Sequence, residues 1–216
     1  MKQHLQTGAP LSLATMMVAA ALLFLLPGSA QAGDEQPSDA SRQFLSSSLF
    51  MLFNLLPFEE PPSFVQVNYG RRLTPKDVLI VEAITWQYHG PLGVPWGTTE
   101  DAPSTSFPGR ARDYGVGLAY QRFLWRDAFT ALHAMPFVQQ YFDEDNQKLQ
   151  TGFQLFMTLR FGYHFEFWSD RLFLEPSVAF TAWPINTNLP DDFAKVEAQW
   201  PGYFLFEPGL NIGWNF

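Results

Sequence analysis

The run TGFQLFMTLRFGYHFEFW, at positions 151–168, constrains the fold more than any other part of the sequence. Every second residue from Phe153 to Phe167 is apolar, and the alternate positions are mostly glycine or polar. A period of two predicts a β-strand with one apolar face. Strands of soluble proteins are usually about five or six residues long. A strand of this length, with polar residues on its second face, is typical of a transmembrane β-barrel.

Six other runs have strand patterns of the same kind, at 64–72, 78–89, 113–125, 128–142, 171–183 and 204–216. Short connections alternate with long ones, and the long connections lie at 90–112, 143–148 and 184–203. This order predicts an all-β, antiparallel, up-and-down barrel. In outer-membrane barrels the short turns face the periplasm and the long loops face outside.

An even number of strands requires one more, and the candidate is FLSSSLFMLFNLLPF at 44–58. Leu45, Leu49, Leu52 and Leu56 also share one helical face, so an interfacial helix is the alternative. We expect a strand, because it completes a barrel of eight strands. A closed ring pairs every backbone group and leaves no strand edge in lipid.

The first 32 residues have the order of a secretory signal peptide: a basic start, an apolar run at 11–26, a Pro-Gly breaker and the sequence Ala-Gln-Ala at 30–32. We expect cleavage after residue 32, then a polar linker at 33–43 and the barrel at 44–216. The chain has no cysteine, a formal net charge of -8 and no cluster of basic residues, so nucleic acid is excluded as a partner. His89, His133 and His164 lack ligand spacing, so we expect neither a metal nor another cofactor.

The chain ends on Phe216, and Trp214, Ile212, Leu210 and Phe204 share its face of the last predicted strand. This ending resembles the C-terminal assembly signal of bacterial outer-membrane barrels, which the barrel-assembly machinery reads in the periplasm. The runs NYGRRLTPKDVL, YQRF, TGFQLFMTLRFGYHF, LEPSVAFTAWPINTN and FLFEPGLNIGW resemble those of an uncharacterised family of small outer-membrane barrel proteins, over roughly residues 60–216. The resemblance implies a monomer in the Gram-negative outer membrane, in contact with its lipids and lipopolysaccharide. It implies no known activity.

Polar side chains on the second face of the strands are expected to point into the lumen. They are Glu82, Asp113, Gln121, His133, Gln154, Arg160, His164, Glu166, Glu175, Ser177, Glu207 and Asn211. A two-residue turn at 169–170 places His164 opposite Glu175 and Arg160 opposite Ala179. Polar groups in a narrow barrel need partners. We therefore expect a structural polar network of Arg160, His164, Glu166, Glu175 and Glu207.

His164, Ser177 and Glu175 are the candidates for a catalytic group, as in a lipid A deacylase or acyltransferase. His164 lies close to a periplasmic turn, however, and no nucleophile motif surrounds Ser177. We expect a barrel with a structural or binding role through its extracellular loops, which include the aromatic residues Trp86 and Trp96. The alternatives are a lipid-modifying enzyme of the outer leaflet and a narrow pore, for which eight strands leave little room.

Overall fold

The computed structural model describes residues 43–57, 61–98 and 102–216. The predicted signal peptide and residues 33–42 of the predicted linker lie outside this part of the chain. The strands are β1 (Gln43–Ser48), β2 (Val65–Arg72), β3 (Asp77–Tyr88), β4 (Arg110–Trp125), β5 (Ala128–Phe142), β6 (Lys148–Tyr163), β7 (Phe165–Phe167), β8 (Leu172–Thr187) and β9 (Tyr203–Asn215). Two short helices, η2 (Leu49–Leu55) and α2 (Asp191–Glu197), lie in the connections.

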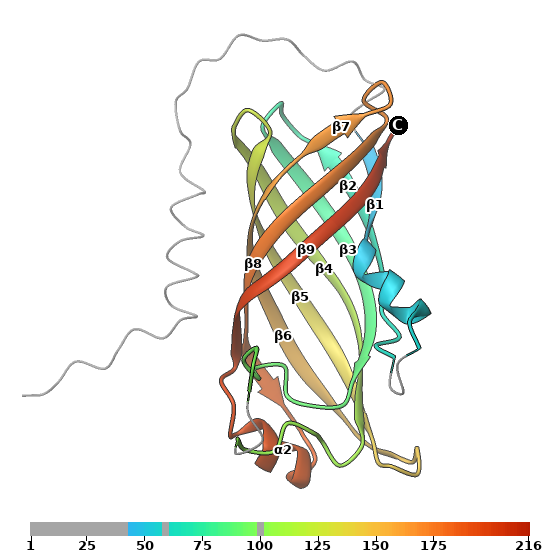
Figure 1. The fold of residues 1–216 in the computed structure, drawn as a ribbon, viewed down its shortest axis with the longest axis vertical. Helices are drawn as coiled ribbons and strands as arrows, with labels where there is room; N and C mark the ends of the chain where they lie inside the picture. The colour runs from blue at the N-terminus through green and yellow to red at the C-terminus, as the bar shows by residue number, and fades with distance from the viewer. Residues whose placement is uncertain (1–42, 58–60, 99–101) are drawn as a thin grey trace, which may run out of the picture. The chain divides into compact units, whose positions relative to one another are not determined.

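The strands form a closed antiparallel ring (Figure 1). Each strand pairs with its neighbour in sequence, except that β6 pairs with β8 and not with β7, and β1 pairs with β9 to close the ring. Strand β7 continues β6 beyond His164 along the same partner, β8, so the two together form one interrupted strand. The described residues therefore make an up-and-down barrel of eight strands, and the prediction from the sequence is confirmed.

The two ends of the barrel differ in their connections. The turn end, at the top of Figure 1, carries the short turns after β2, β4 and β7 and the C-terminal residue. The loop end carries the long connections after β3 and β8, and α2 lies in the second of these. At the turn end the Phe216 amide donates a 2.9 Å hydrogen bond to the Gln43 carbonyl, which joins the last residue to β1.

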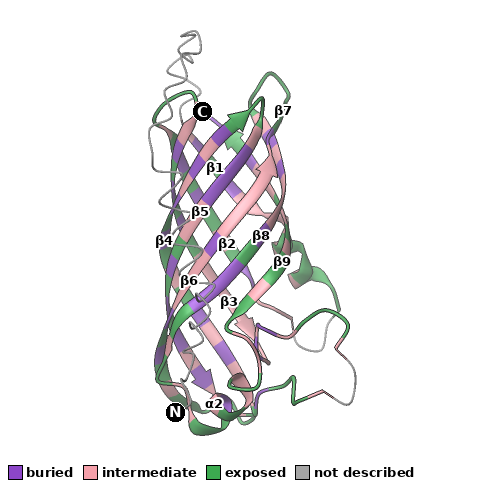
Figure 2. Ribbon diagram, turned by 90° about the vertical axis from the view of Figure 1, so that its left-hand side faces the viewer, coloured by how far each residue is buried: buried purple, intermediate pink, exposed green. Residues whose placement is uncertain are grey.

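Side chains alternate between the lumen and the outer surface, and Figure 2 shows buried and exposed positions alternating along the strands. The outward positions are aliphatic or aromatic even where they are well exposed, as at Val67, Val81, Val116, Leu118 and Val138. The inward positions of β6 include Gln154 and Thr158, which are buried. The outer surface of the sheet is thus apolar and the lumen contains polar groups, as in membrane barrels.

The segment 44–58 is only partly the strand that the sequence predicts. Strand β1 ends at Ser48, whose hydroxyl caps η2 by accepting a 3.2 Å hydrogen bond from the Phe50 amide. From Leu49 to Phe53 every residue is apolar. A strand there would have no polar face for the lumen, which explains why the alternating pattern and the strand stop together. Neither η2 nor α2, nor any other helix within the described residues, is long and apolar enough to cross a membrane.

The register predicted for the hairpin at 169–170 is confirmed, but a bulge changes the faces of β9. Arg160 lies opposite Ala179, as the turn at 169–170 predicts. In β9 the pairing shifts between the partners of Ala179 and Thr181, because two residues, Leu205 and Phe206, oppose one on β8. An extra residue reverses the alternation beyond it. Phe204, which the sequence places on the outer face with Phe216, therefore lines the lumen.

Candidate functional site

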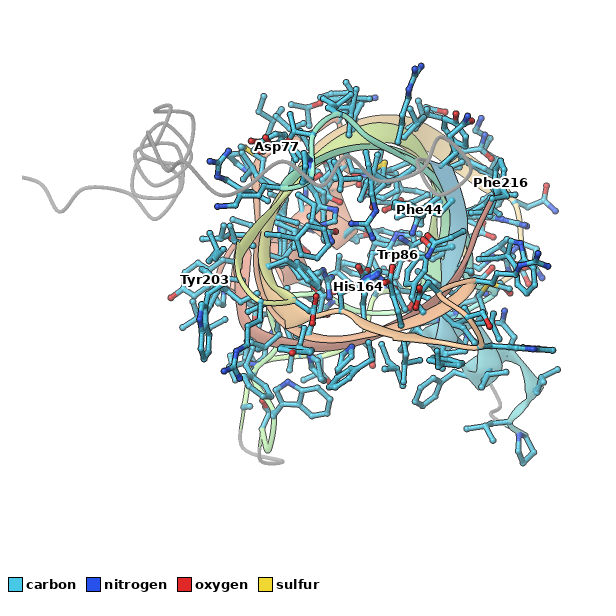
Figure 3. All side chains as sticks on the ribbon, turned by 90° about the horizontal axis from the view of Figure 1, so that it is seen from above. Phe44, Asp77, Trp86, His164, Tyr203 and Phe216 are labelled. Atoms are coloured by element: carbon cyan, nitrogen blue, oxygen red, sulfur yellow. The ribbon has the colours of Figure 1, made fainter. Side chains whose placement is uncertain are left out.

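The turn end of the lumen is filled by an apolar cluster. Its members come from five strands and are Phe44, Val78, Ile80, Ala119, Phe123, Phe129, Ala131 and Phe173. Phe173 packs edge to face on Phe44 at 5.2 Å and lies against the His164 ring at 4.7 Å. Figure 3, which looks down the barrel, shows Phe44 and His164 inside the ring and Phe216 outside it. Packing of this density leaves no axial passage at the turn end.

A charged group lies beside this cluster. His164 Nδ1 is 2.8 Å from Glu175 Oε1, and His164 Nε2 is 3.0 Å from Glu166 Oε1. Glu175 also accepts a 3.0 Å hydrogen bond from Gln121, and Arg72 pairs with Glu166 at 3.2 Å. The predicted contacts among His164, Glu166 and Glu175 are therefore present in the structure. Arg72 is an additional member.

Arg160 and Glu207 form a separate pair nearer the middle of the lumen. Arg160 Nη2 lies 3.1 Å from Glu207 Oε1, and its Nη1 donates to Ser177 Oγ at 2.9 Å. Gly209 permits this approach, because a Cβ at that position would come within 2.1 Å of Arg160 Nη1. The five-residue network expected from the sequence is thus divided into two groups. Ser177 bonds to Arg160 and to the Gly209 carbonyl, so the structure does not join it to His164.

A second histidine pairs with a glutamate in the lumen. His133 Nδ1 lies 3.0 and 3.1 Å from the two oxygens of Glu82, and its Nε2 is buried with no hydrogen-bond partner. Strand β4 lies between these residues and presents Gly117 opposite Glu82 and Ala119 opposite His133. These small residues let the two longer side chains meet. In the neutral tautomer whose proton is on Nδ1, toward the carboxylate, Nε2 is an acceptor.

No described Ser or Thr hydroxyl makes a hydrogen bond to the imidazole of His133 or His164. Nucleophilic catalysis by a hydroxyl requires its base within hydrogen-bond reach. The candidate group of His164, Ser177 and Glu175 is therefore not assembled as a triad. Within the part of the chain that the structure describes, no group of three His, Asp or Glu residues is arranged to hold a metal ion.

A second aromatic cluster lies at the loop end of the lumen. Phe193 of α2 has an exposed fraction of 0% and packs on Phe107 at 4.8 Å and on Tyr141 at 5.2 Å. Glu197 of the same helix accepts a 3.0 Å hydrogen bond from Trp183 Nε1, and burial raises the pKa of this carboxyl above its ordinary value. The long connection after β8 therefore turns inward and covers the loop end.

The side chain of Trp86 lies in the lumen, whereas the sequence interpretation placed it in an extracellular loop. It is part of β3, donates a 3.2 Å hydrogen bond to Asp113 and packs edge to face on Phe156 at 6.1 Å. Figure 3 shows its side chain within the ring. Phe156 in turn stacks on Trp183 at 5.3 Å with an angle of 9° between the rings. Aromatic side chains thus line the lumen below the loop-end cluster.

Between the two clusters lies a cavity of about 440 Å³. The half of the cavity nearer the turn end is polar, and we call it the floor. It consists of Glu82, His133, Arg160, Glu207 and Asn211. The half nearer the loop end is aromatic and is lined by Trp86, Trp96, Phe137, Phe156, Trp183 and Phe204. Small-molecule sites in proteins have volumes of about 300–1,000 Å³ and combine an apolar lining with a few polar groups. The cavity has both properties.

Two solved structures are similar to this chain. The crystal structure of Neisserial surface protein A is 11% identical in sequence, with a TM-score of 0.39, over 81% of this chain and 93% of that one. Ail, the attachment invasion locus protein of Yersinia pestis, solved with the heparin analogue sucrose octasulfate, is also 11% identical, with a TM-score of 0.39, over 81% of this chain and 94% of its own. Likenesses of this size transfer neither a function nor a ligand. The sequence matches no protein-family model and no curated protein.

The sequence interpretation missed Arg72 and the pairing of Glu82 with His133. Arg72 shares a strand face with Asn68, and the alternation of β2 could have placed it in the lumen. The pairing of Glu82 with His133 depends on the registers of two hairpins. A bulge between Phe123 and Trp125 shifts the second register by one residue, so counting from the turn gives the wrong partner.

Proposed function

We propose that the protein is an integral outer-membrane β-barrel that binds a small amphiphilic molecule within its lumen. The outer surface supports the membrane location. Val116 and Leu118 of β4 have exposed fractions of 65% and 54%, and Val67 and Val138 are similarly exposed. Apolar patches of this extent on a soluble protein are rare unless they meet a partner or a membrane. The terminal Phe216 agrees with an outer-membrane assembly signal.

The observation that carries the binding role is a cavity between two clusters of apolar side chains. An open channel requires a continuous polar path, whereas here Phe173 and its neighbours fill the turn end and Phe193 covers the loop end. Eight strands also leave an interior that side chains can fill or that holds one small ligand. The aromatic half near the loop end suits an apolar chain, and the polar floor suits a polar head group. The proposed site is therefore the lumen beneath the loops, not the outer surface of the loops.

Trp183 provides a direct test, because its ring lines the cavity and has an exposed fraction of 5%. The purified barrel is reconstituted into vesicles and titrated with a long-chain alcohol that carries bromine atoms, which quench tryptophan fluorescence on contact. We expect saturable quenching that is reduced in Trp183→Phe. The same preparation should show no step conductance in planar bilayers. Quenching that is unsaturable and equal in the two proteins would refute lumen binding.

A further inference from the structure

The wall of the barrel is open on one side. Strand β1 pairs with β9 only from Asn211 to Asn215, because β1 ends at Ser48. The remainder of β9, from Tyr203 to Leu210, has no strand partner on that side among the described residues. On the other side of the opening, β2 begins only at Val65. Figure 1 shows η2 on the outer flank of the barrel at the level where β1 stops.

Helix η2 is held at the rim of this opening. The Asn54 side chain donates a 2.6 Å hydrogen bond to the Phe64 carbonyl and accepts a 2.9 Å hydrogen bond from the Phe64 amide. Phe50 packs edge to face on Phe64, with 5.0 Å between the ring centroids. The helix also lies against β9. Phe50 and Phe64 on one rim and Phe204 and Pro208 on the other all line the central cavity. The opening therefore leads from the outer surface of the barrel into the cavity.

The opening gives the cavity a route to the outer surface, because Phe50, which is 42% exposed, also lines the cavity. In a bilayer an unpaired strand edge is costly, because lipid cannot satisfy its N–H and C=O groups. In this sheet the edge contains Pro208, which lacks an N–H group, and proline in sheets is found mainly at edges and bulges. The rim that replaces the missing strand is a seven-residue helix. Two hydrogen bonds join its Asn54 side chain to the backbone of Phe64, the residue before β2. Such an element can move without breaking the barrel.

The floor of the cavity indicates the chemistry of the head group. It holds two carboxylates, Glu82 and Glu207, and one guanidinium, Arg160, so one negative charge is uncompensated when His133 is neutral. A further anion there would be repelled. Among the five floor residues, His133 has a buried atom without a hydrogen-bond partner, Nε2, and in the neutral imidazole this atom accepts a hydrogen bond. A hydroxyl group can supply that bond and adds no charge.

We propose that a single-chain amphiphile with an uncharged, hydroxyl-type head enters the lumen sideways from the bilayer, between β9 and η2, and places its head at His133. This inference rests on the proposed lumen binding. A membrane lipid that inserted only an acyl chain would bring its apolar tail to the charged floor and leave His133 without a partner. A molecule taken up whole fits both halves of the cavity.

The absence of cysteine in the chain allows the route to be tested by labelling single introduced cysteines with one bulky, charged thiol reagent. Phe50→Cys places the label at the rim of the side opening. Asp192→Cys places it on the exposed face of α2 at the loop end, and Val116→Cys places it on the lipid-facing surface of β4. Heat-modifiable migration on gels confirms that each labelled protein is folded. The readout is the rate at which brominated alcohol, added to the vesicles, quenches Trp183.

We expect the label at Phe50→Cys to remove the fast phase of quenching, and the labels at Asp192→Cys and Val116→Cys to leave it unchanged. If the label at Asp192→Cys removes the fast phase, or if all three labels act equally, entry through the side opening is refuted while lumen binding stands. If the unlabelled protein shows no Trp183-dependent quenching, the proposed function itself fails.

The head group is tested with three brominated probes of equal chain length: an alcohol, a carboxylic acid and an alkane. We expect the alcohol to bind about two- to tenfold more tightly than the alkane, because one net hydrogen bond changes the affinity by about that factor. In His133→Phe this advantage should disappear while binding of the alkane persists. Tighter binding of the acid than of the alcohol at neutral pH would overturn the assignment of an uncharged head. Quenching by brominated phospholipid alone, with no effect of the alcohol, would identify an inserted lipid chain and would also overturn it.

Discussion

Replacement of Glu175 tests the buried charged group at the turn end. Its carboxylate has an exposed fraction of 5% and accepts two hydrogen bonds through Oε1, at 2.8 Å from His164 and at 3.0 Å from Gln121. A hydrogen bond to a charged group contributes about 1.5–3 kcal/mol, whereas a neutral one contributes about 0.5–1.5 kcal/mol. Glu175→Gln keeps the shape and one acceptor oxygen. It should therefore lower the free energy of unfolding by about 1 kcal/mol for each bond, or about 2 kcal/mol in total.

Glu175→Leu is the more severe change, because it leaves the donors of His164 and Gln121 buried without an acceptor. Each unsatisfied donor costs about 1–3 kcal/mol, and removal of one partner from a buried ionic group costs about 3–5 kcal/mol. We expect a loss in that range for Glu175→Leu. The order of stability should be wild type, then Glu175→Gln, then Glu175→Leu.

Urea unfolding of the reconstituted barrels, followed by tryptophan fluorescence, measures these differences. Glu144→Gln, on an exposed loop, is the matched control and should have the wild-type midpoint. Lipid A from cells that carry each variant should have an unchanged acylation profile. A wild-type midpoint for Glu175→Leu would show that the charged group does not stabilise the barrel. A changed lipid profile with an unchanged midpoint would instead favour a catalytic role for Glu175.

Three further predictions concern the surface and the loop end. Phe216→Ser should block membrane assembly, because it removes the terminal aromatic residue, and normal amounts of heat-modifiable protein in outer-membrane fractions would contradict this. Leu159→Arg should cost about 2–4 kcal/mol in urea unfolding if this outward side chain meets the middle of the bilayer; equal stability of Gln147→Arg, on an exposed loop, and Leu159→Arg would show that the face is misassigned. Burial raises the pKa of Glu197, so the folded barrel binds more protons than the unfolded chain between the two pKa values, and stability should fall as pH rises through that interval. Glu197→Gln should remove this dependence, and an unchanged pH profile of the unfolding midpoint would argue against a buried carboxylate.

The strand order could be predicted because its signal is long and repeated. The alternation from Phe153 to Phe167 extends over a whole strand, and a tight turn follows it directly. Counting from that turn gave the correct partner of Arg160. The same reasoning could not give the partner of His133, because the bulge after Phe123 adds a residue that no local pattern marks. A shift of one residue exchanges the two faces of a strand.

The features that define the cavity were the hardest to predict. Phe204 turns inward only because Leu205 and Phe206 form a bulge, and both faces of that stretch are apolar in sequence. The end of β1 at Ser48 leaves the wall open, whereas the count of strands alone favoured a full strand up to residue 58. Trp86 lies near the end of the strand predicted at 78–89, and its position in the lumen depends on the register of β3 with β4. Each case depends on how the strands pair in the folded protein, and the alternation of residues along one strand does not predict that pairing.

The most direct test of a lipid-facing barrel with a closed lumen is a spin-label scan of β6 in bilayers. Single cysteines at Leu155 and Leu159, which face outward, and at Gln154 and Thr158, which face inward and are buried, are labelled with a nitroxide. Collisions with dissolved oxygen report contact with lipid, and collisions with a water-soluble nickel complex report contact with water. We predict high oxygen accessibility at the two leucine positions and low accessibility to both reagents at the other two. High nickel accessibility at Gln154 and Thr158 would reveal a water-filled lumen, and equal oxygen accessibility at all four positions would contradict the barrel in the membrane.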